Sequence, residues 1–280
     1  MVRRDPAQFG YQQSRWSLKR LAQTLDWLDL TTEGGLSQLL KRLGIRHKRA
    51  RDYIHSPDPN YEAKVSYLTR CHMRAWYDPA RYVFLYLDEF TYTRQPALAH
   101  EYEQRGRYQP LARRSYRSDT QCRGIGALNA ITGQVTYRQA SKIQLPFLSE
   151  FYAVVCQTYP DAETIYVAQD NWPVHVHPDV IVRLEPQRSP FWPTIPSNWP
   201  TEPHARAVRD NLPIQLVFLP TYASWLNPIE KLWRWLRQDV LHLHRLSHDW
   251  QLLKQHVWDF IHQFAAGSTD LLRYVGLLSV

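Results

Sequence analysis

Cysteine is scarce in this chain of 280 residues, and its three copies, Cys71, Cys122 and Cys156, lie far apart. None belongs to a C-x-x-C pair, so the sequence offers neither a disulfide framework nor a zinc knuckle. The first residues lack the apolar stretch of a signal peptide, and no uncharged apolar run approaches the ~20 residues of a membrane span. We therefore expect a cytoplasmic protein that has no contact with a membrane.

Acidic residues are also in the minority. The chain has 34 Lys and Arg against 26 Asp and Glu, which gives a formal net charge of +8 at pH 7. Such a surplus favours a polyanionic partner such as nucleic acid, and we expect the protein to associate with the nucleoid. Hydrophobic residues make up 44% of the chain, enough for a sizeable core in one large domain or in a small domain followed by a larger one.

The N-terminal part of the chain has a helical pattern over residues 14–56. Ser17 can cap the first helix, and Leu18, Leu21, Ala22, Leu25 and Leu28 then follow at helical spacing. We expect Gly34-Gly35 to break the chain. A second helix should follow this break and end at Gly44.

A short, very basic helix is expected next, over residues 46–54. Helix, glycine turn and basic helix together outline a helix-turn-helix, so we expect residues 1–59 to form a small all-α, winged-helix-like domain. The same charge pattern is also typical of a solvated helical face. The expected DNA-binding residues here are Arg46, His47, Lys48, Arg49 and Arg51.

The remainder of the chain predicts an α/β domain over residues 81–280. It is reached through a connecting segment, residues 60–80, in which a helix is expected from Tyr61 to Tyr77. Apolar runs predict strands at 82–87, 125–129, 135–139, 165–169 and 214–219, with a hairpin turn at Thr132-Gly133. Helices are expected over 146–158 and from Pro228 onward. This order predicts a mixed sheet flanked by helices. Residues 186–203 are rich in Pro and Trp and look like an insertion or a rigid loop.

An arginine-rich stretch with little periodicity lies between Arg94 and Arg123. Tyrosines are interleaved with the arginines, and such a surface can hold phosphates and stack bases, although it is equally typical of a basic loop. The DNA-binding candidates in this stretch are Arg105, Arg107, Arg113, Arg114 and Arg117.

Three acidic residues carry the chemistry that the sequence predicts. Asp88 and Asp170 each follow an apolar run, and Glu230 lies where a helix should begin. If the three carboxylates converge, they form a cage of hard oxygen ligands suited to Mg²⁺. The neighbouring Glu89 should point to the opposite face of the sheet, which makes it a poorer ligand than Asp88.

Each carboxylate also has an ordinary structural interpretation. Asp88 and Asp170 are typical of turns after strands, and Asn227 with Glu230 could form a capping box, in which Pro228 takes the first helical position. Arg234 and Arg237 follow Glu230 on a neighbouring face of the helix, where they could bind phosphate or pair with the acid.

The side chains expected to support the carboxylates are Asn171, His175 and Asn227. A zinc site at His175 and His177 is disfavoured, because no third soft ligand is evident.

Three sequence blocks resemble the catalytic blocks of mariner-type transposases, and most closely those of the bacterial insertion-sequence branch of that superfamily. The blocks are Tyr86-Leu87-Asp88-Glu89, Gln169-Asp170-Asn171-Trp172-Pro173-Val174-His175, and the run from Leu219 to Trp233, LPTYASWLNPIEKLW. The ending from Leu271 to Leu277 and the segment from Ser56 to Tyr61 are also similar to that branch. The resemblance therefore spans nearly the whole chain.

This resemblance implies an RNase H-like domain that holds two Mg²⁺ ions, replaceable by Mn²⁺, between Asp88, Asp170 and Glu230. It implies a homodimer acting on double-stranded DNA, which comprises the terminal repeats of a transposon and the target. Water first attacks phosphodiesters at the transposon ends, and the freed 3′-hydroxyl then attacks target DNA at a TA dinucleotide.

The chain departs from that family in two ways. The 59 residues between Asp170 and Glu230 exceed the usual spacing, and the surplus coincides with the Pro/Trp-rich stretch. There is also room for only about one N-terminal DNA-binding subdomain. Two alternatives remain: a non-catalytic DNA-binding protein derived from a transposase, and an RNase H-like nuclease that cuts without strand transfer.

Overall fold

The computed structural model describes residues 1–28, 32–48, 55–184 and 189–278. The chain divides into two compact units, Met1–Tyr53 and Ile54–Val280, and each is considered by itself. No helix in the described ranges is both long enough and apolar enough to cross a lipid bilayer.

The N-terminal unit is built on two α-helices, α1 (Leu18–Thr24) and α2 (Glu33–Arg42), with short 3-10 turns η1 (Pro6–Phe9) and η2 (Asp26–Leu28). Ser17 caps α1 as predicted, because its hydroxyl accepts the Arg20 N–H at 3.2 Å. Leu21 of α1 and Leu36 of α2 are buried in this small unit. A helical N-terminal region is therefore confirmed.

The predicted break at Gly34-Gly35 is wrong. Both glycines lie in the first turn of α2, and the Thr32 hydroxyl accepts the Gly35 N–H at 3.1 Å. A side-chain cap and the burial of Leu36 outweigh the cost of about 1 kcal/mol that glycine imposes on a helix. The predicted end of the helix at Gly44 is confirmed, since its φ of 72° is the left-handed conformation that stops a helix.

The basic helix predicted over residues 46–54 is only partly open to comparison. Arg46, His47 and Lys48 are exposed and have no regular secondary structure, so the prediction is wrong for these three residues. The left-handed Gly44 turns the chain out of α2 just before them, and three successive cationic or polar side chains have no apolar face with which to fix a new helix. Arg49, Arg51 and the rest of the predicted helix lie outside the described residues.

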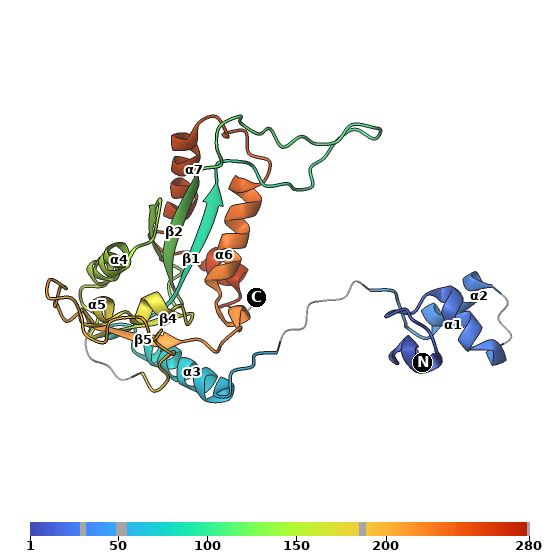
Figure 1. Cartoon of the computed structure of the whole chain (residues 1–280), viewed down its shortest axis with the longest axis horizontal. Coiled ribbons are helices and arrows are strands. Elements are labelled where there is room, and N and C mark those ends of the chain that lie inside the picture. Colours follow the sequence, from blue (N-terminus) through green and yellow to red (C-terminus); the bar gives the residue numbers. More distant parts are fainter. Residues whose placement is uncertain (29–31, 49–54, 185–188, 279–280) are drawn as a thin grey trace. The chain divides into compact units, whose positions relative to one another are not determined.

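The second unit is organised around a mixed five-stranded sheet in the order β3-β2-β1-β4-β5 (Figure 1). Its strands are β1 (Tyr82–Thr93), β2 (Gln121–Asn129), β3 (Val135–Ala140), β4 (Thr164–Gln169) and β5 (Ile214–Phe218). The first three strands are antiparallel, and β1, β4 and β5 are parallel. The predicted hairpin is confirmed: Gly133 turns with φ 70°, and the Asn129 side chain accepts two backbone N–H groups of the turn.

Helices cover both faces of the sheet, and the alternation of side chains along β1 shows how. Phe84, Tyr86 and Phe90 face a core that includes α3 (Tyr61–Tyr77), α6 (Ile229–Leu236), α7 (Trp250–His262) and α8 (Thr269–Val275). Val83, Leu85 and Leu87 face the other core, which includes α4 (Leu145–Thr158) and α5 (Pro178–Ile181). Figure 1 shows α4 and α5 on one side of the strands and α6 on the other. The predicted α/β fold with a mixed sheet is confirmed.

The helix over Tyr61–Tyr77 was expected as a connector between domains. In the structure it belongs to the second unit, since α3 contacts β1, β4 and β5 and buries Leu68, Cys71 and Ala75. Burial of these three side chains against the sheet stabilises the helix by about 25 cal/mol for each Å² of apolar surface removed from water.

The described part of the Pro/Trp-rich stretch, residues 189–203, contains no helix or strand. It is nevertheless attached to the sheet: the Trp192 ring packs against Phe218 of β5, and Phe191 packs edge-on against Tyr67 of α3. This segment therefore lies against the β5 edge of the sheet.

Candidate active site

Asp88 lies within β1 and does not end it, so the prediction that it follows the strand is wrong. The parallel pairing of β1 with β4 stops at Tyr86 and Ala168, whereas the antiparallel pairing with β2 continues and places Asp88 opposite Gly126. Strands β1 and β4 are therefore no longer paired at Asp88. The carboxylate therefore stands at the edge of the parallel half of the sheet, on a backbone fixed by its β2 partner.

Trp233 of α6 holds this carboxylate. Its indole N–H donates to Asp88 Oδ2 at 3.0 Å, and the ring is buried against Phe90 with centroids 4.4 Å apart. The ring fits because residue 126 is glycine: a Cβ there would stand 2.6 Å from Trp233 Cη2. This role of Trp233 could not be predicted, because the polar end of an indole carries no separate signal in a sequence.

Asp170 directly follows β4, as predicted. Its Oδ1 accepts the Trp172 N–H at 2.9 Å, and the same oxygen lies 3.5 Å from Nε2 of the buried His175. The next residue, Asn171, donates from its side-chain amide to the Leu219 carbonyl at 2.8 Å. This bond connects the end of β4 to the loop that leads from β5 to α6.

Glu230 lies in the first turn of α6, as predicted, but the capping box does not form. The Asn227 side chain donates to the Leu87 carbonyl of β1 at 3.1 Å and makes no cap bond to the helix. Asn227 thus connects the start of α6 to the strand that carries Asp88. The Leu87 carbonyl thus takes the Asn227 side chain in place of the helix N-terminus. This could not be predicted from the sequence, because the carbonyl lies 140 residues away.

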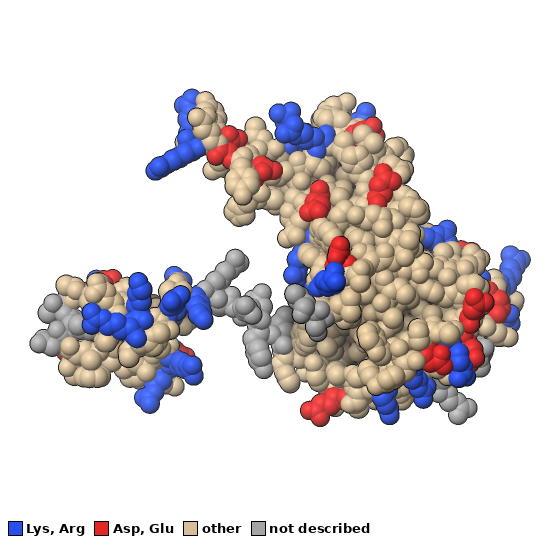
Figure 2. All heavy atoms as spheres, turned by 180° about the vertical axis from the view of Figure 1, so that it is seen from behind, with Lys and Arg blue, Asp and Glu red and all other residues tan. Residues whose placement is uncertain are grey.

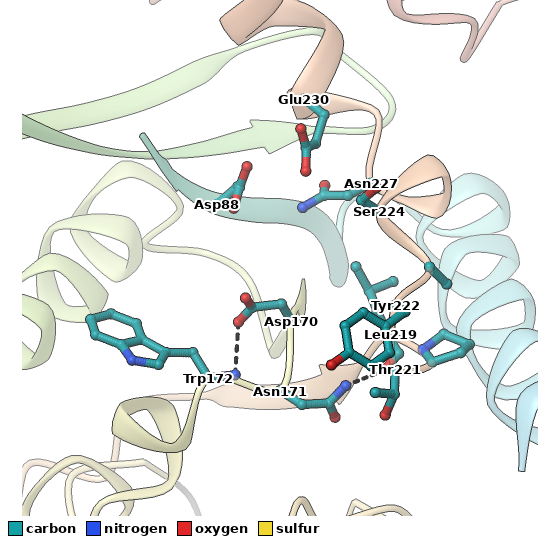
Figure 3. Close-up of a pocket in the computed structure, with 12 residues that line it drawn as sticks. Asp88, Asp170, Asn171, Trp172, Leu219, Thr221, Tyr222, Ser224, Asn227 and Glu230 are labelled. Atoms are coloured by element: carbon teal, nitrogen blue, oxygen red, sulfur yellow. Dashed lines mark hydrogen bonds between the residues drawn. The ribbon is translucent and has the colours of Figure 1, made fainter. Parts of the chain in front are cut away.

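The three carboxylates line one pocket of about 410 Å³, together with Asn171, Asn227 and the loop from Leu219 to Ser224. Figure 3 shows Asp88, Asp170 and Glu230 turned toward the same space from three different elements. Among the described residues, no three His, Cys, Asp or Glu side chains lie close enough to hold a single ion. The three carboxylates therefore line a common pocket without forming a closed site for a single ion.

Mutual repulsion in this pocket appears in the pKa values. Burial, followed by the charges of Glu89, Glu230 and Asp170, raises the pKa of Asp88 to about 8. Burial also raises the pKa of Glu230, although Arg237 and Arg234 act against it. The pKa of Asp170 is lowered: burial opposes ionisation, but the hydrogen bonds from His175 and the Trp172 N–H outweigh it.

The donor chemistry of the pocket matches a hard divalent cation. A buried carboxylate with a raised pKa is stabilised when a cation replaces its proton. Asn171 Oδ1 and Asn227 Oδ1 are buried without a hydrogen-bond partner, and both side chains line the pocket. Carboxylate and amide oxygens are the ligand types that Mg²⁺ and Mn²⁺ take.

A family model of the DDE superfamily endonucleases matches residues 83–253, which contain all three carboxylates. The chain belongs to this family.

Individual relatives agree with that assignment. The "Insertion element IS630 uncharacterized 39 kDa protein" of Shigella sonnei is 24% identical over 98% of this chain and 72% of its own length. The fold is similar to that of the Mos1 transposase in a paired-end complex with the left transposon end, with a TM-score of 0.59 and 15% identity over 95% of this chain and 71% of the other. The Mos1 mariner paired-end complex with Mn has the same TM-score at 16% identity, over 95% of this chain and 72% of the other. The resemblance to mariner-type and insertion-sequence transposases is confirmed.

The arginines predicted to bind DNA in this DDE endonuclease are exposed wherever the structure describes them. Arg105, Arg107, Arg113, Arg114 and Arg117 lie in a long segment without helix or strand that projects from the end of β1 (Figure 1). Tyr102, Tyr108 and Tyr116, at 100%, 67% and 88% exposed, accompany them. Arg234 and Arg237 are also exposed and lie close enough to Glu230 to act on its pKa.

In the N-terminal unit, Lys and Arg side chains gather with few acids between them on the face drawn in Figure 2. The exposed Arg46, His47 and Lys48 belong to this unit.

His175 and His177 have separate environments. His177 Nδ1 accepts the Asp179 N–H at 3.2 Å and so caps α5, whereas His175 is fully buried beside Asp170.

The wall of the pocket is anchored to the segment that precedes α3. Asp58 Oδ2 accepts the Thr221 N–H at 2.9 Å, and Ser56 donates to the Thr221 carbonyl at 2.6 Å. Lys64 of α3 completes the contact with an ion pair to Asp58 at 2.8 Å, in which the Asp58 side chain is 4% exposed. The packing of this segment on the active-site loop could not be predicted, because its partner Thr221 lies 163 residues away in sequence.

Proposed function

We propose that this DDE endonuclease is the transposase of an insertion sequence. It binds the ends of the element, hydrolyses phosphodiester bonds there and joins the 3′-hydroxyl to target DNA at TA. The single observation that carries the proposal is the pocket shared by Asp88, Asp170 and Glu230, which come from β1, β4 and α6 and lie within the segment that matches the family.

The three carboxylates are the proposed ligands of two divalent ions, Mg²⁺ in the cell, with Mn²⁺ able to replace it. The chemistry that such ions supply is activation of the attacking water or 3′-hydroxyl and stabilisation of the leaving oxygen. Two of the similar Mos1 structures are described as complexes with Mn and with Mg. This supports a divalent cation here.

The side chains of this protein do the positioning. The Trp233 N–H fixes Asp88, the Trp172 N–H and His175 hold Asp170, and Asn227 ties the helix of Glu230 to β1. Arg234 lies on the helix of Glu230 and Arg237 directly follows it, and both would bind phosphates of the scissile strand. A misplacement of about 1 Å in such a site can cost ~10²-fold in rate, so these contacts are part of the catalytic arrangement.

Double-stranded DNA is the proposed partner at both steps. The N-terminal unit would bind the terminal repeats through Arg46, His47, Lys48, Arg49 and Arg51. The arginine-rich segment, Arg105 to Arg117, would hold phosphates of the end or the target. A homodimer can hold two ends at once, and the nucleoid is the corresponding location in the cell. The Mos1 complexes with transposon ends support DNA ends as the partner.

The test is a reaction in vitro on labelled duplexes that carry the DNA flanking the gene, with Mg²⁺ present. Wild-type protein should give cleaved strands and strands joined to target. Asp170→Ala should give neither, although it should still shift the duplex in a gel. The matched control is Asp161→Ala, which removes an exposed carboxylate from the turn before β4 and should react like wild type.

Other outcomes separate the alternatives. Cleavage by wild type without joined products would favour a nuclease, and binding without cleavage in either Mg²⁺ or Mn²⁺ would favour a non-catalytic DNA-binding protein. Cleavage retained by Asp170→Ala would overturn the assignment of the site.

A further inference from the structure

Glu89 is an acidic residue that lies outside the pocket of the three carboxylates. It follows Asp88 in β1, so its side chain points to the opposite face of the sheet, and it does not line the pocket of the three carboxylates. Its side chain is 17% exposed, and Oε1 is buried without a hydrogen-bond partner. Burying a carboxylate costs free energy unless a partner stabilises its charge, so the position needs an explanation other than packing.

The group that faces Glu89 is His175. Its Nε2 lies 3.5 Å from Glu89 Oε1 and also 3.5 Å from Asp170 Oδ1, so one ring nitrogen stands between two carboxylates. Carboxylates that face a histidine ring nitrogen fix both the tautomer and the orientation of the ring.

The far side of the same ring is fixed as well. The Tyr152 hydroxyl donates to Gln169 Oε1 at 2.8 Å and lies 3.2 Å from His175 Nδ1. Tyr152 therefore contacts one ring nitrogen while the other faces the carboxylates, and these contacts on opposite sides give the ring a single orientation. Tyr152, Gln169 and His175 are all fully buried, which leaves Nε2 directed at the two carboxylates.

The exposure of Asp170 explains what such support would contribute. Its side chain is 58% exposed; Oδ1 accepts a hydrogen bond from the Trp172 N–H and lies 3.5 Å from His175 Nε2. An exposed carboxylate that is free to rotate loses conformational entropy when it binds a metal, and a fixed partner removes that cost.

We propose that Glu89 is a positioning residue, which acts through His175 to hold the Asp170 carboxylate in the orientation that binds the divalent ion. This rests on the proposed function of the pocket. Glu89 itself touches neither the ion nor DNA.

The test compares three substitutions by the binding of Mn²⁺ alone, measured from the loss of the free-ion EPR signal, and by the Mn²⁺ dependence of cleavage. Glu89→Leu removes the carboxylate at similar size, and we expect Mn²⁺ to bind at least about tenfold more weakly. Glu89→Gln keeps an acceptor and should stay within about threefold of wild type. The matched control Glu163→Leu breaks an exposed ion pair with Arg81 at the far end of β4 and should leave the affinity unchanged.

Cleavage data distinguish positioning from general damage. For Glu89→Leu the Mn²⁺ concentration at half-maximal rate should rise by the same factor as the binding constant, while the rate at saturating Mn²⁺ and the DNA affinity stay within about threefold. His175→Asn keeps a donor toward Tyr152 but cannot reach the carboxylates. In that background, Glu89→Leu should add less than a twofold further loss.

Wild-type Mn²⁺ affinity in a folded Glu89→Leu protein would overturn the proposal, as would additive losses in the double variant. If Glu89→Leu fails to fold, as judged by thermal melting, His175→Asn decides alone: unchanged Mn²⁺ affinity sinks the proposal, and a tenfold loss supports it. A wild-type protein that binds Mn²⁺ but does not cut DNA would instead count against the proposed function.

Discussion

The contact between Gly126 and Trp233 allows a prediction about a residue that is not itself catalytic. Gly126→Ala would place a Cβ 2.6 Å from Trp233 Cη2 and 3.1 Å from Cζ2, whereas carbon atoms normally approach to about 3.5–4.0 Å. The indole must therefore move by about 1 Å. The Trp233–Asp88 hydrogen bond, 3.0 Å at present, would then exceed the limit for a hydrogen bond.

Two effects of opposite sign determine the result. Replacing glycine with alanine in a compatible strand stabilises a protein by about 0.4–1 kcal/mol through the unfolded state. Overpacking a rigid core costs about 1–3 kcal/mol, and the buried ring of Trp233, packed against Phe90, has little room to move. We expect the steric term to win, with a net loss of about 1–2 kcal/mol in the free energy of unfolding and a fall of about 10²-fold in cleavage at saturating Mn²⁺.

Urea unfolding and strand-cleavage assays measure the two quantities, and Trp233→Phe is the background that isolates the cause. Phenylalanine lacks the outer indole atoms, so Gly126→Ala should be neutral or slightly stabilising in that background. The reasoning is refuted if Gly126→Ala is as stable and as active as wild type. It is also refuted if the loss is equally large in the Trp233→Phe protein, because the clash would then lie elsewhere.

Two further predictions concern pH, and both are checked by urea unfolding in EDTA over a pH series. The folded-state pKa of Asp88 is raised to about 8, whereas the carboxyl of an unfolded Asp has a pKa of about 4. The folded protein therefore holds the proton of Asp88 more tightly than the unfolded chain does. The stability that this contributes is complete below pH 4 and is lost as the pH rises toward 8. Asp88→Asn should therefore be more stable than wild type by about 2–4 kcal/mol at pH 7, with no advantage at pH 4; equal curves at pH 7 would contradict this. For Asp58, burial raises the pKa, but the bonds from Lys64, Thr221 and Asn60 outweigh it and lower the value to about 2. Its contribution is present above about pH 4 and lost as the pH falls through 2, so Asp58→Asn should cost about 2 kcal/mol at pH 7 and progressively less below pH 4. A pH-independent difference would argue against the ion pair as the cause.

The sequence predicted those parts of the fold that depend on local pattern. The apolar runs identified each of the five strands, and the helix expected over Tyr61–Tyr77 has those bounds in the structure. Periodicity and turn residues act over a few positions, so they are visible without tertiary information. The three conspicuous carboxylates could be named for the same reason, since each lies in a distinctive block.

Features that depend on distant partners could not be predicted. β1 continues past Asp88 because β2 pairs with it through Thr93, and Asn227 leaves its helix because Leu87 offers a carbonyl. Gly34 and Gly35 are helical because a cap and a buried leucine override their low helix propensity. The roles of Trp233 and Glu89 also depend on contacts between distant parts of the chain, and the residue types alone do not indicate them.

Asp88 and Glu89 are consecutive acids on opposite faces of one strand, and this makes β1 intolerant of a change in length. Deleting one residue between Tyr82 and Leu87 would slide the strand by one register and exchange every side chain between its two faces. An acid would still face the pocket, but it would be a glutamate, one methylene longer, at the position that Trp233 now matches to an aspartate. The segment after α5 has the opposite property, because a surface connection can gain or lose residues at small entropic cost. Insertions and deletions that survive in relatives of this protein should therefore accumulate between Leu184 and Leu212 and be absent from β1.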